Sequence, residues 1–357
     1  MGLFSFGKGK GLVGVDIGSS AVKAVELKSV GKSGTDFQLV NMGMEALPPE
    51  AIVDGAIMDS GAVIDAIQRL FTTQKIKTAE VATSVSGNAV IVKKISLPEM
   101  SDEELAESIH WEAEQYIPFD IQDVSIDYQV VDEGGGGGNM DVLLVAVKKD
   151  KISDYTSAIS QAGKNPQVVD VDVFALQNCY EINYGLGSGG IVALLNIGAS
   201  IMNINILKNG SSVFNRDIAV GGNQYTDAIQ KDLNLSFDQA EALKRGAPVD
   251  GASPESLDPI LQTVSENIVL EIQKTFDFFK ATSSEDHVDQ IFISGGASKV
   301  YGLPELVAER LETSVELLNP FNAITYNPKD FDAEFIEDVG ASAAIAVGLA
   351  VRKVGDR

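Results

Sequence analysis

Residues 14–20 read GVDIGSS, and residues 194–200 read LLNIGAS. Each stretch is a short apolar strand pattern that ends in an acid or its amide, followed closely by a glycine and a hydroxyl side chain. Glycine in such a turn lets backbone N–H groups approach an anion closely. The two stretches therefore predict a pair of phosphate-binding turns that face each other, one from each half of the chain.

The sequence around the two turns follows the same plan twice. Each turn lies in a run of three short strands, followed by a helix with one apolar face and then a strand that ends in small residues. The helices are expected over 60–74 and 261–280, and the closing strands over 79–87 and 289–296. Asn209-Gly210 supplies the positive φ angles of a tight hairpin in the second run. The repeat predicts a duplicated α/β fold with two lobes.

Each half also carries an insert. The first insert, 88–165, is expected to contain a strand, a helix, a hairpin and a second helix over 150–162, which together form a small α+β unit. Ser101 and Glu104 predict a capping box at the first helix. Five glycines at 134–138 predict an exposed hairpin tip.

The second insert, 222–290, is expected to be mainly helical, with a loop over 248–259. A last helix is expected over 338–353, with small residues for close packing. These patterns divide the chain into four expected units: the first-lobe core at 11–87 with 166–189 and 338–357, the inserted α+β unit at 88–165, the second-lobe core at 190–221 with 291–337, and the helical unit at 222–290.

Composition excludes several classes of function. The 357 residues include 27 basic and 51 acidic side chains, a net charge of −24, which argues against nucleic acid and against direct attachment to anionic lipid. One cysteine and two histidines argue against a disulfide framework or a thiolate zinc site, and fit a reducing cytoplasm. The longest apolar run, 339–351, is shorter than the roughly 20 residues that span a membrane. The opening MGLFSFGKGK could touch lipid, although we expect a loosely ordered tail.

The residue types at the first turn suit a nucleotide triphosphate. Ser19 and Ser20 add hydroxyl donors to the backbone of Gly18, and Lys23 adds a point charge for the phosphates. Asp16 is best placed to hold Mg²⁺ through water, because a carboxylate does not sit against phosphate unaided. The second turn offers Asn196 and the backbone of the run Gly198, Ala199 and Ser200.

Three further stretches extend the expected site. Gly221 and Gly222 follow the third strand of the second half, and Glu241 and Lys244 lie three apart on one helix face, where they could reach a ribose and base. The strand end 294–298 offers the backbone to adenine and phosphate through Gly295, Gly296 and Ser298. Each stretch also has an ordinary interpretation in isolation, as a helix cap, a surface ion pair or a strand-end turn.

Taken in order, these motifs resemble the actin-like ATPase superfamily, which includes actin, heat-shock chaperones, sugar kinases and the cell-division protein FtsA. GVDIGSS resembles its first phosphate motif, LLNIGAS its second, and IFISGGASKVYGL at 291–303 its adenosine motif. The chain is most similar to the PilM family of type IV pilus assembly proteins, on stretches that run from the first turn almost to the end: IPFD at 117–120, RDIAVGG at 216–222, AEALK at 240–244 and GLAVRKV at 348–354.

The resemblance implies an actin-like, ribonuclease-H-like duplicated fold in its FtsA-like variant, with the insert at 88–165 as the extra subdomain, called 1C. It implies ATP and Mg²⁺ as ligands and a cytoplasmic protein. It also implies a partner, the N-terminal cytoplasmic peptide of PilN, bound in a groove between the inserted subdomain and the first lobe. The protein would then sit at the inner face of the inner membrane only through this partner, among the platform and motor proteins of pilus assembly.

Asn196 departs from the family pattern, which has Asp in the second phosphate motif. An amide oxygen can accept a hydrogen bond from Mg²⁺-bound water but brings no charge, and losing a charged hydrogen bond worth roughly 1.5–3 kcal/mol would cost about 10- to 150-fold in metal affinity or rate. Asp172 is a candidate catalytic base, although a structural strand-end acid is the expected role. We therefore expect ATP to be a conformational ligand that is hydrolysed slowly or not at all.

Two other functions remain open from the sequence. A small-molecule kinase or phosphatase on this fold would need a positioned acid or base near the γ-phosphate. An FtsA-like filament-forming ATPase is the other alternative, although that family usually continues into an amphipathic membrane helix, whereas this sequence ends in VGDR.

Overall fold

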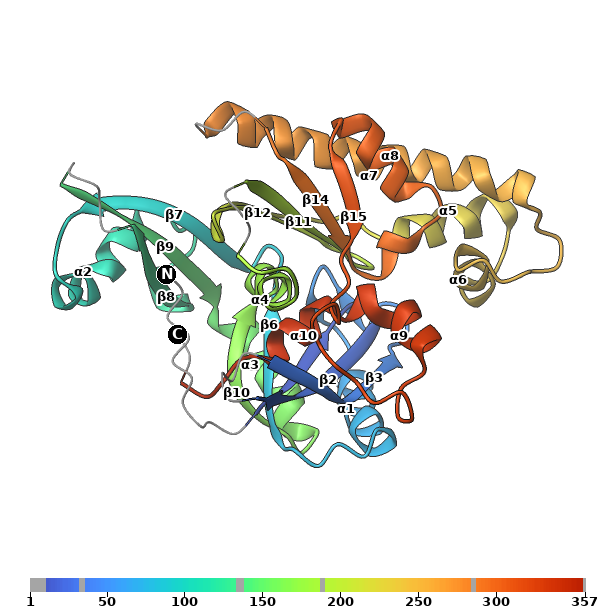
Figure 1. The fold of residues 1–357 in the computed structure, drawn as a ribbon, viewed down its shortest axis with the longest axis horizontal. Helices are drawn as coiled ribbons and strands as arrows, with labels where there is room; N and C mark the ends of the chain where they lie inside the picture. Colours follow the sequence, from blue (N-terminus) through green and yellow to red (C-terminus); the bar gives the residue numbers. More distant parts are fainter. Residues whose placement is uncertain (1–10, 32–35, 133–137, 187–189, 284–286, 356–357) are drawn as a thin grey trace.

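The computed structural model describes residues 11–31, 36–132, 138–186, 190–283 and 287–355 (Figure 1). The expectations for the first ten residues and for the glycines at 134–137 lie outside these ranges. Within them, no helix is long and apolar enough to cross a membrane.

Two five-stranded sheets share one plan, which confirms the predicted duplication. In each, a central strand pairs antiparallel with the next strand of the chain and parallel with a later one: β1 with β2 and β6, and β11 with β12 and β14. The first sheet has the order β10-β6-β1-β2-β3, from Asn165–Val171, Glu80–Val85, Val13–Ile17, Ala21–Val30 and Asp36–Ala46. The second has the order β13-β12-β11-β14-β15, from Ser211–Ile218, Met202–Lys208, Ile191–Ile197, Gln290–Ser294 and Ser314–Leu317.

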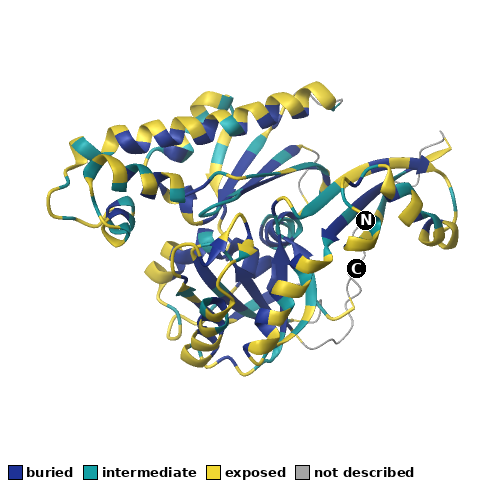
Figure 2. Cartoon of the chain, turned by 180° about the vertical axis from the view of Figure 1, so that it is seen from behind, coloured by how far each residue is buried: buried dark blue, intermediate teal, exposed yellow. Residues whose placement is uncertain are grey.

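Helices cover both faces of each sheet, as the alternation of buried and exposed residues along them requires (Figure 2). On the first sheet, α1 (Ser60–Thr73) and α3 (Lys149–Gln161) cover one face. α4 (Asp172–Tyr184) and α10 (Ala344–Ala350) cover the other, and α4 also contacts the second sheet. The outer face of the second sheet is covered by α5 (Asn223–Leu233), α7 (Pro254–Thr282) and α8 (Leu303–Leu311), with α6 (Phe237–Lys244) beside α5.

Small residues let α10 fit between the first sheet and α4. A Cβ added to Gly348 would lie 1.7 Å from the Ala175 carbonyl oxygen, and one added to Gly14 would lie 2.1 Å from the Ala346 carbonyl oxygen. The expected single helix over 338–353 is wrong, because α9 (Ala333–Gly340) is separated from α10 by a 3₁₀ turn, Ala341–Ala343. The Ala341 carbonyl accepts a hydrogen bond from Gly295 N at 2.8 Å, which uses this break to join the two lobes.

The first insert has its own small sheet and core. Its sheet has the order β7-β9-β8, formed by Val90–Pro98, Asn139–Lys148 and Val124–Asp132, and α2 (Asp102–Glu114) packs on it. The predicted capping box is present, since Ser101 N donates to Glu104 Oε2 at 2.9 Å and Glu104 N donates to Ser101 Oγ at 3.3 Å. α3 instead shares the first-lobe core with α1, so we propose that the inserted unit ends near Lys148 rather than at 165.

The expected loop over 248–259 is only partly correct. α7 already begins at Pro254, since Ser253 caps it and proline is favoured in the first turn of a helix. The remaining short elements are β4 (Ile52–Val53), β5 (Ala56–Ile57) and the 3₁₀ turns Ile121–Asp123 and Gly296–Lys299.

Candidate functional site

A cleft of about 2060 Å³ lies between the two sheets, and both glycine turns line it. Fourteen of the residues predicted for the site line this cleft: Asp16, Gly18, Ser19, Ser20, Lys23, Asn196, Gly198, Ala199, Ser200, Gly222, Glu241, Lys244, Gly295 and Gly296. Gly221 and Ser298 are buried behind the lining. The structure thus brings together residues from separate stretches of both halves of the sequence.

The first turn joins β1 to β2 and carries an ion pair. Gly18 N donates to Ala21 O at 3.1 Å, which closes the hairpin. Asp16 and Lys23 are directly opposite each other in the strand register, and Lys23 Nζ lies 2.8 Å from Asp16 Oδ2. The charge of Lys23 is therefore paired with that of Asp16. A phosphate entering the cleft would compete for Lys23.

The second turn repeats this geometry between β11 and β12. Gly198 N donates to Ile201 O at 3.0 Å, the counterpart of the bond in the first turn. The start of α5 supports the turn from behind, because Gly222 N donates to Gly198 O at 2.9 Å and Asn223 N to Ala199 O at 2.8 Å. A Cβ at Gly221 would lie 2.5 Å from Gly198 O, so Gly221 permits this close backbone contact.

The cross-strand pair of the second turn is neutral. Asn196 is opposite Asn203, just as Asp16 is opposite Lys23. Asn196 Nδ2 donates to Asn203 Oδ1 at 2.9 Å, and Asn203 Nδ2 donates to Asp217 Oδ1 at 2.8 Å. Burial raises the pKa of Asp217, while the hydrogen bonds from Asn203 and Gly87 and the charge of Lys151 oppose that rise. Sequence reasoning missed Asn203 and Asp217, although aligning the two hairpins would have placed Asn203 at the position of Lys23.

Glu241 and Lys244 form a partly buried network with α5. Lys244 Nζ is paired with Glu241 and donates to Thr226 Oγ1 at 2.8 Å and to Gly222 O at 3.2 Å. Burial alone would raise the pKa of Glu241, but the bonds from Lys244 and Thr226 overcome it and lower that pKa. This pair therefore fixes α6 beside the second turn and also presents polar groups to the cleft.

Asp172 lies at the start of α4 and lines the same cleft as Asp16. Its Oδ1 accepts a hydrogen bond from Ser84 Oγ at 2.5 Å. Burial, reinforced by the negative charge of Asp16, raises the pKa of Asp172 to about 6. A carboxylate with a pKa near neutrality in a cleft has the chemistry of a general base.

The end of β14 presents bare backbone to the cleft. A Cβ at Gly296 would meet no atom within 4 Å, whereas one at Gly295 would lie 2.4 Å from the Ile197 carbonyl oxygen. Ser298 supports this turn from its buried position, since its hydroxyl donates to Gly295 O at 2.7 Å. Gly296 is therefore a place where a flat ring could approach the main chain.

The side chains available as metal ligands decide how the cleft could hold a cation. Among the residues that the structure describes, no group of three or more His, Cys, Asp and Glu side chains could hold a metal ion. Mg²⁺ commonly keeps several waters and takes its other ligands from one or two carboxylates and from substrate phosphates. Asp16 in the cleft fits a hydrated ion of this kind, because its carboxylate could accept hydrogen bonds from Mg²⁺-bound water while phosphate oxygens and water serve as the ligands.

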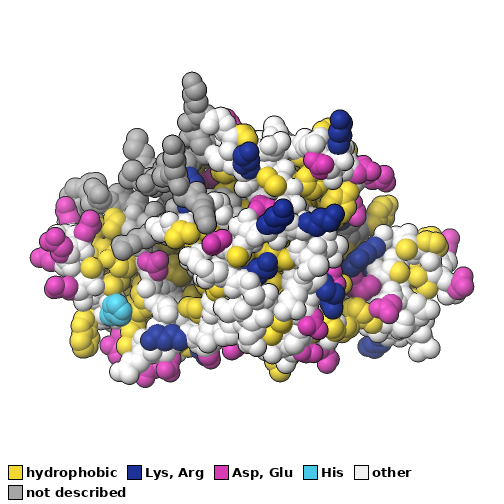
Figure 3. Space-filling view, turned by 90° about the horizontal axis from the view of Figure 1, so that it is seen from below, with side chains coloured by type: hydrophobic (Ala, Val, Ile, Leu, Met, Phe, Trp, Pro, Cys, Tyr) yellow, Lys and Arg dark blue, Asp and Glu magenta, His cyan; other side chains and the backbone are white. Residues whose placement is uncertain are grey.

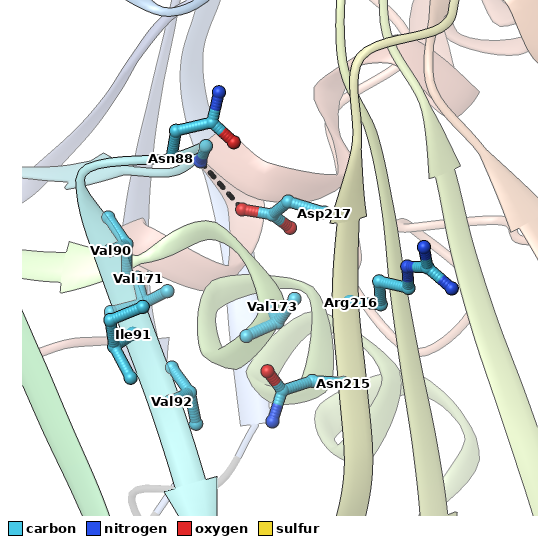
Figure 4. A pocket seen from close by; sticks show the side chains of 10 residues that line it. Asn88, Val90, Ile91, Val92, Val171, Val173, Asn215, Arg216 and Asp217 are labelled. Atoms are coloured by element: carbon cyan, nitrogen blue, oxygen red, sulfur yellow. Dashed lines mark hydrogen bonds between the residues drawn. The ribbon is translucent and has the colours of Figure 1, made fainter. Parts of the chain in front are cut away.

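A second, smaller pocket of about 250 Å³ lies between β7 and β13 (Figure 4). Both are the last strands of their sheets, so each has one edge without a neighbouring strand among the residues that the structure describes. One wall is apolar and the other polar, and Gly87 N donates to Asp217 Oδ2 at 2.6 Å across one end. The lining residues are Gly87, Asn88, Val90, Ile91, Val92, Val171, Val173, Asn215, Arg216 and Asp217.

The surface charge is unevenly distributed. In the view from below, acidic side chains lie at the end formed by the insert, at the opposite end and along the lower edge, while basic ones are scattered between them (Figure 3). α2 alone has Asp102, Glu103 and Glu104 in its first turn. This face carries no broad basic patch of the kind that binds nucleic acid, among the residues that the structure describes.

Comparison with known proteins places this geometry in a family. The family model described as type IV pilus assembly protein PilM matches residues 14–354. A structure of a PilM–PilN type IV pilus biogenesis complex is similar with a TM-score of 0.86 and 28% identity, covering 97% of this chain and 99% of the other.

More distant relatives share the fold. Cell division protein FtsA of Staphylococcus epidermidis is 25% identical over 86% of this chain and 74% of the relative. MreB5 of Spiroplasma citri bound to AMPPNP matches 95% of this chain and 94% of the other, with a TM-score of 0.53 and 13% identity. The chain therefore belongs to the family of the type IV pilus assembly protein PilM and has the actin-like ATPase fold.

Proposed function

We propose that this pilus assembly protein binds ATP with Mg²⁺ in the cleft between its two sheets and uses the nucleotide as a conformational ligand. The observation that carries the proposal is the pair of equivalent glycine turns on one cleft, with Lys23 beside the first. MreB5, which shares the fold, has been solved with AMPPNP, an ATP analogue. Filling such a cleft with a charged ligand would draw the two lobes together.

Different residues of this protein would hold different parts of the nucleotide. The turn amides and Lys23 suit the phosphates, and Asp16 suits the hydration shell of Mg²⁺. Glu241 and Lys244 suit the ribose, and the backbone at Gly296 suits the adenine ring. The neutral pair of Asn196 and Asn203 adds no charge on the second side of the cleft, which favours slow or no hydrolysis.

Nucleotide binding is tested by titrating the protein with a fluorescent ATP analogue in the presence of Mg²⁺. Lys23→Met removes the cation at the first turn, and we expect at least a tenfold loss of affinity, since a charged hydrogen bond is worth about 1.5–3 kcal/mol. Lys28→Met is the matched control, because Lys28 is exposed on the same strand and is absent from the cleft lining. Equal affinities for the two variants would count against the proposed site.

We further propose that the pocket between β7 and β13 is part of the groove for the N-terminal peptide of a PilN-like partner. The first lobe contributes Val171 and Val173 to this pocket, but β13 of the second sheet also lines it, so the proposed groove extends beyond the expected boundary between the insert and the first lobe. The similar PilM was solved in a complex with PilN. An extended peptide can add its backbone to an exposed strand edge, and apolar wall residues such as Val92 and Val173 would receive its alternate side chains. Such a partner would hold the protein at the inner face of the inner membrane, beside the platform and motor proteins.

Peptide docking is tested with a synthetic peptide from the start of the neighbouring PilN-like protein. Val92→Lys places a charge in the apolar wall, and we expect peptide retention to be lost while the protein stays folded. Val40→Lys is the control, because Val40 is 42% exposed on the edge strand β3 and lies outside this pocket. Retention that is unchanged by Val92→Lys would place the peptide elsewhere.

An alternative function is favoured by one observation. Asp172 lines the cleft with a pKa raised to about 6, which suits a base in a hydrolase, phosphatase or kinase. If the protein were such an enzyme, phosphate release would exceed a few turnovers per minute and Asp172→Asn would abolish it. Release below that rate in wild type, with nucleotide bound, supports the conformational role.

A further inference from the structure

A chain of hydrogen bonds runs from the second glycine turn to the edge of the pocket between β7 and β13. Asn196, Asn203 and Asp217 are successive cross-strand neighbours on β11, β12 and β13. Asn196 Nδ2 donates to Asn203 Oδ1 at 2.9 Å, and Asn203 Nδ2 donates to Asp217 Oδ1 at 2.8 Å. The other carboxylate oxygen accepts from Gly87 N at 2.6 Å, in the first lobe.

The direction of this chain is dictated by Asp217. Both of its oxygens act as acceptors, so Asn203 must present its amide nitrogen to them. The oxygen of Asn203 then faces Asn196, which must in turn present its own nitrogen. The Asn196 oxygen is left with one long contact, 3.5 Å from the Ser294 hydroxyl, and so keeps a lone pair for another donor.

We propose that Asp217, acting through Asn203, is a positioning residue that fixes the Asn196 amide with its oxygen available to a donor in the nucleotide cleft. The inference deepens the proposed function and rests on it, because the donor would be Mg²⁺-bound water or a nucleotide hydroxyl. Asn196 and Asn203 both line the cleft, while Asp217 lies at its back, on the neighbouring pocket.

This arrangement gives a physical reason for Asn at position 196. An aspartate there would face the oxygen of Asn203, and two acceptors would meet. Flipping the Asn203 side-chain amide would only transfer the acceptor–acceptor contact to Asp217, because the Asn203 oxygen would then face that carboxylate. Asn203 is 1% exposed, so water does not relieve the mismatch. In the first lobe the same position can be an aspartate, because its cross-strand partner is the cation Lys23.

The test is a double-variant cycle that exchanges the acid and the amide. Asn196→Asp alone should raise the unfolding equilibrium constant about 5- to 150-fold, since one buried polar pair loses its bond. Adding Asp217→Asn should restore stability, because every bond can then run in the opposite direction. The new carboxylate at position 196 would accept from Asn203 Nδ2, and Asn203 Oδ1 would accept from the new amide at position 217. The oxygen of that new amide would keep the bond from Gly87 N.

Asp217→Asn alone separates positioning from a merely structural role. The hydrogen-bond chain can reverse its donors and acceptors without losing bonds, so stability should fall less than in Asn196→Asp. Asn196 would then turn its amide nitrogen, instead of its oxygen, toward the cleft. We expect the Mg²⁺-dependent part of nucleotide affinity to fall about tenfold and to recover in the double variant, which again offers an acceptor at position 196. Any lost attraction between Asp217 and Lys151 occurs in both variants that carry Asp217→Asn and cancels in the cycle.

The stability arm uses urea unfolding without nucleotide, and the binding arm uses a fluorescent ATP analogue with and without Mg²⁺. Ser212→Ala is the matched control, because it removes a buried bond of 2.6 Å to Asn205 on the same strand pair and its effect should simply add to that of Asn196→Asp. Rescue of stability together with a Mg²⁺ effect in Asp217→Asn supports the proposal.

Two results overturn it: additive losses in the double variant, or unchanged Mg²⁺ dependence in Asp217→Asn. If wild type and all variants failed alike to bind nucleotide, the proposed function would fail, and the stability arm would still judge the hydrogen-bond chain by itself.

Discussion

Two glycines, Gly296 in the cleft lining and Gly221 behind it, should respond differently to the same substitution. A Cβ at Gly221 would lie 2.5 Å from Gly198 O and 2.7 Å from Ala199 O, so the second turn would have to move. A Cβ at Gly296 would meet no atom within 4 Å. Gly221→Ala therefore strains the free protein, while Gly296→Ala should affect only a ligand that lies against the backbone there.

The magnitudes follow from this difference. Overpacking against a fixed backbone costs about 1–3 kcal/mol, so Gly221→Ala should raise the unfolding equilibrium constant about 5- to 150-fold. Gly296→Ala should change stability by less than about 0.5 kcal/mol, as surface substitutions usually do. A nucleotide against Gly296 would meet the new methyl group, and we expect its affinity to fall by a similar factor of about 5 to 150.

Urea unfolding without nucleotide and titration with a fluorescent ATP analogue measure the two effects separately. Gly296→Ala that binds the analogue as tightly as wild type would refute the placement of the base against this backbone. Gly221→Ala with wild-type stability would refute the tight support of the second turn by the start of α5.

Two further predictions concern stability. The pKa of Asp172 is raised to about 6 in the folded protein. The folded state therefore binds more protons than the unfolded state between about pH 4 and 6. The contribution of Asp172 to stability falls as the pH rises through that window. Asp172→Asn should remove this loss. In urea titrations, the unfolding free energy of the variant relative to wild type should therefore rise by up to about 3 kcal/mol from pH 4 to 7. A difference that stays constant with pH would contradict the raised pKa. Gly348→Ala places a Cβ 1.7 Å from the Ala175 carbonyl oxygen and should destabilise the protein by about 1–3 kcal/mol or more, as measured by thermal unfolding. Gly340→Ala makes only an ordinary contact with Pro320 at 3.7 Å and should be neutral or slightly stabilising in the same assay.

Local patterns were sufficient to predict the duplicated strands and the two turns. The Asp or Asn, the glycine and the hydroxyl side chains lie within a few residues of each other, and the strand patterns around them repeat in the same order. The helix α7 was predicted for a similar reason, because residues such as Leu261, Ile268 and Phe279 keep one apolar face along it.

Features that depend on packing between distant segments could not be predicted in this way. The pattern of α3 shows an apolar face but not which core receives it, and the structure places Tyr155 and Ile159 beside α1 rather than in the insert. The break at Ala341 coincides with a hydrogen bond from Gly295 in the other lobe, a contact between residues far apart in the sequence. The partnership of Asn203 with Asp217 depends on strand register, which a bulge between Ile206 and Leu207 shifts along the same strand pair.

We propose that two equivalent turns from different lobes hold one nucleotide. The most direct measurement is a crystal structure determined with excess ATP and Mg²⁺. We expect phosphates between the turns at Gly18 and Gly198, with Lys23 moved from Asp16 to a phosphate oxygen. A nucleotide bound outside the cleft, or an empty cleft at saturating ATP, would contradict it.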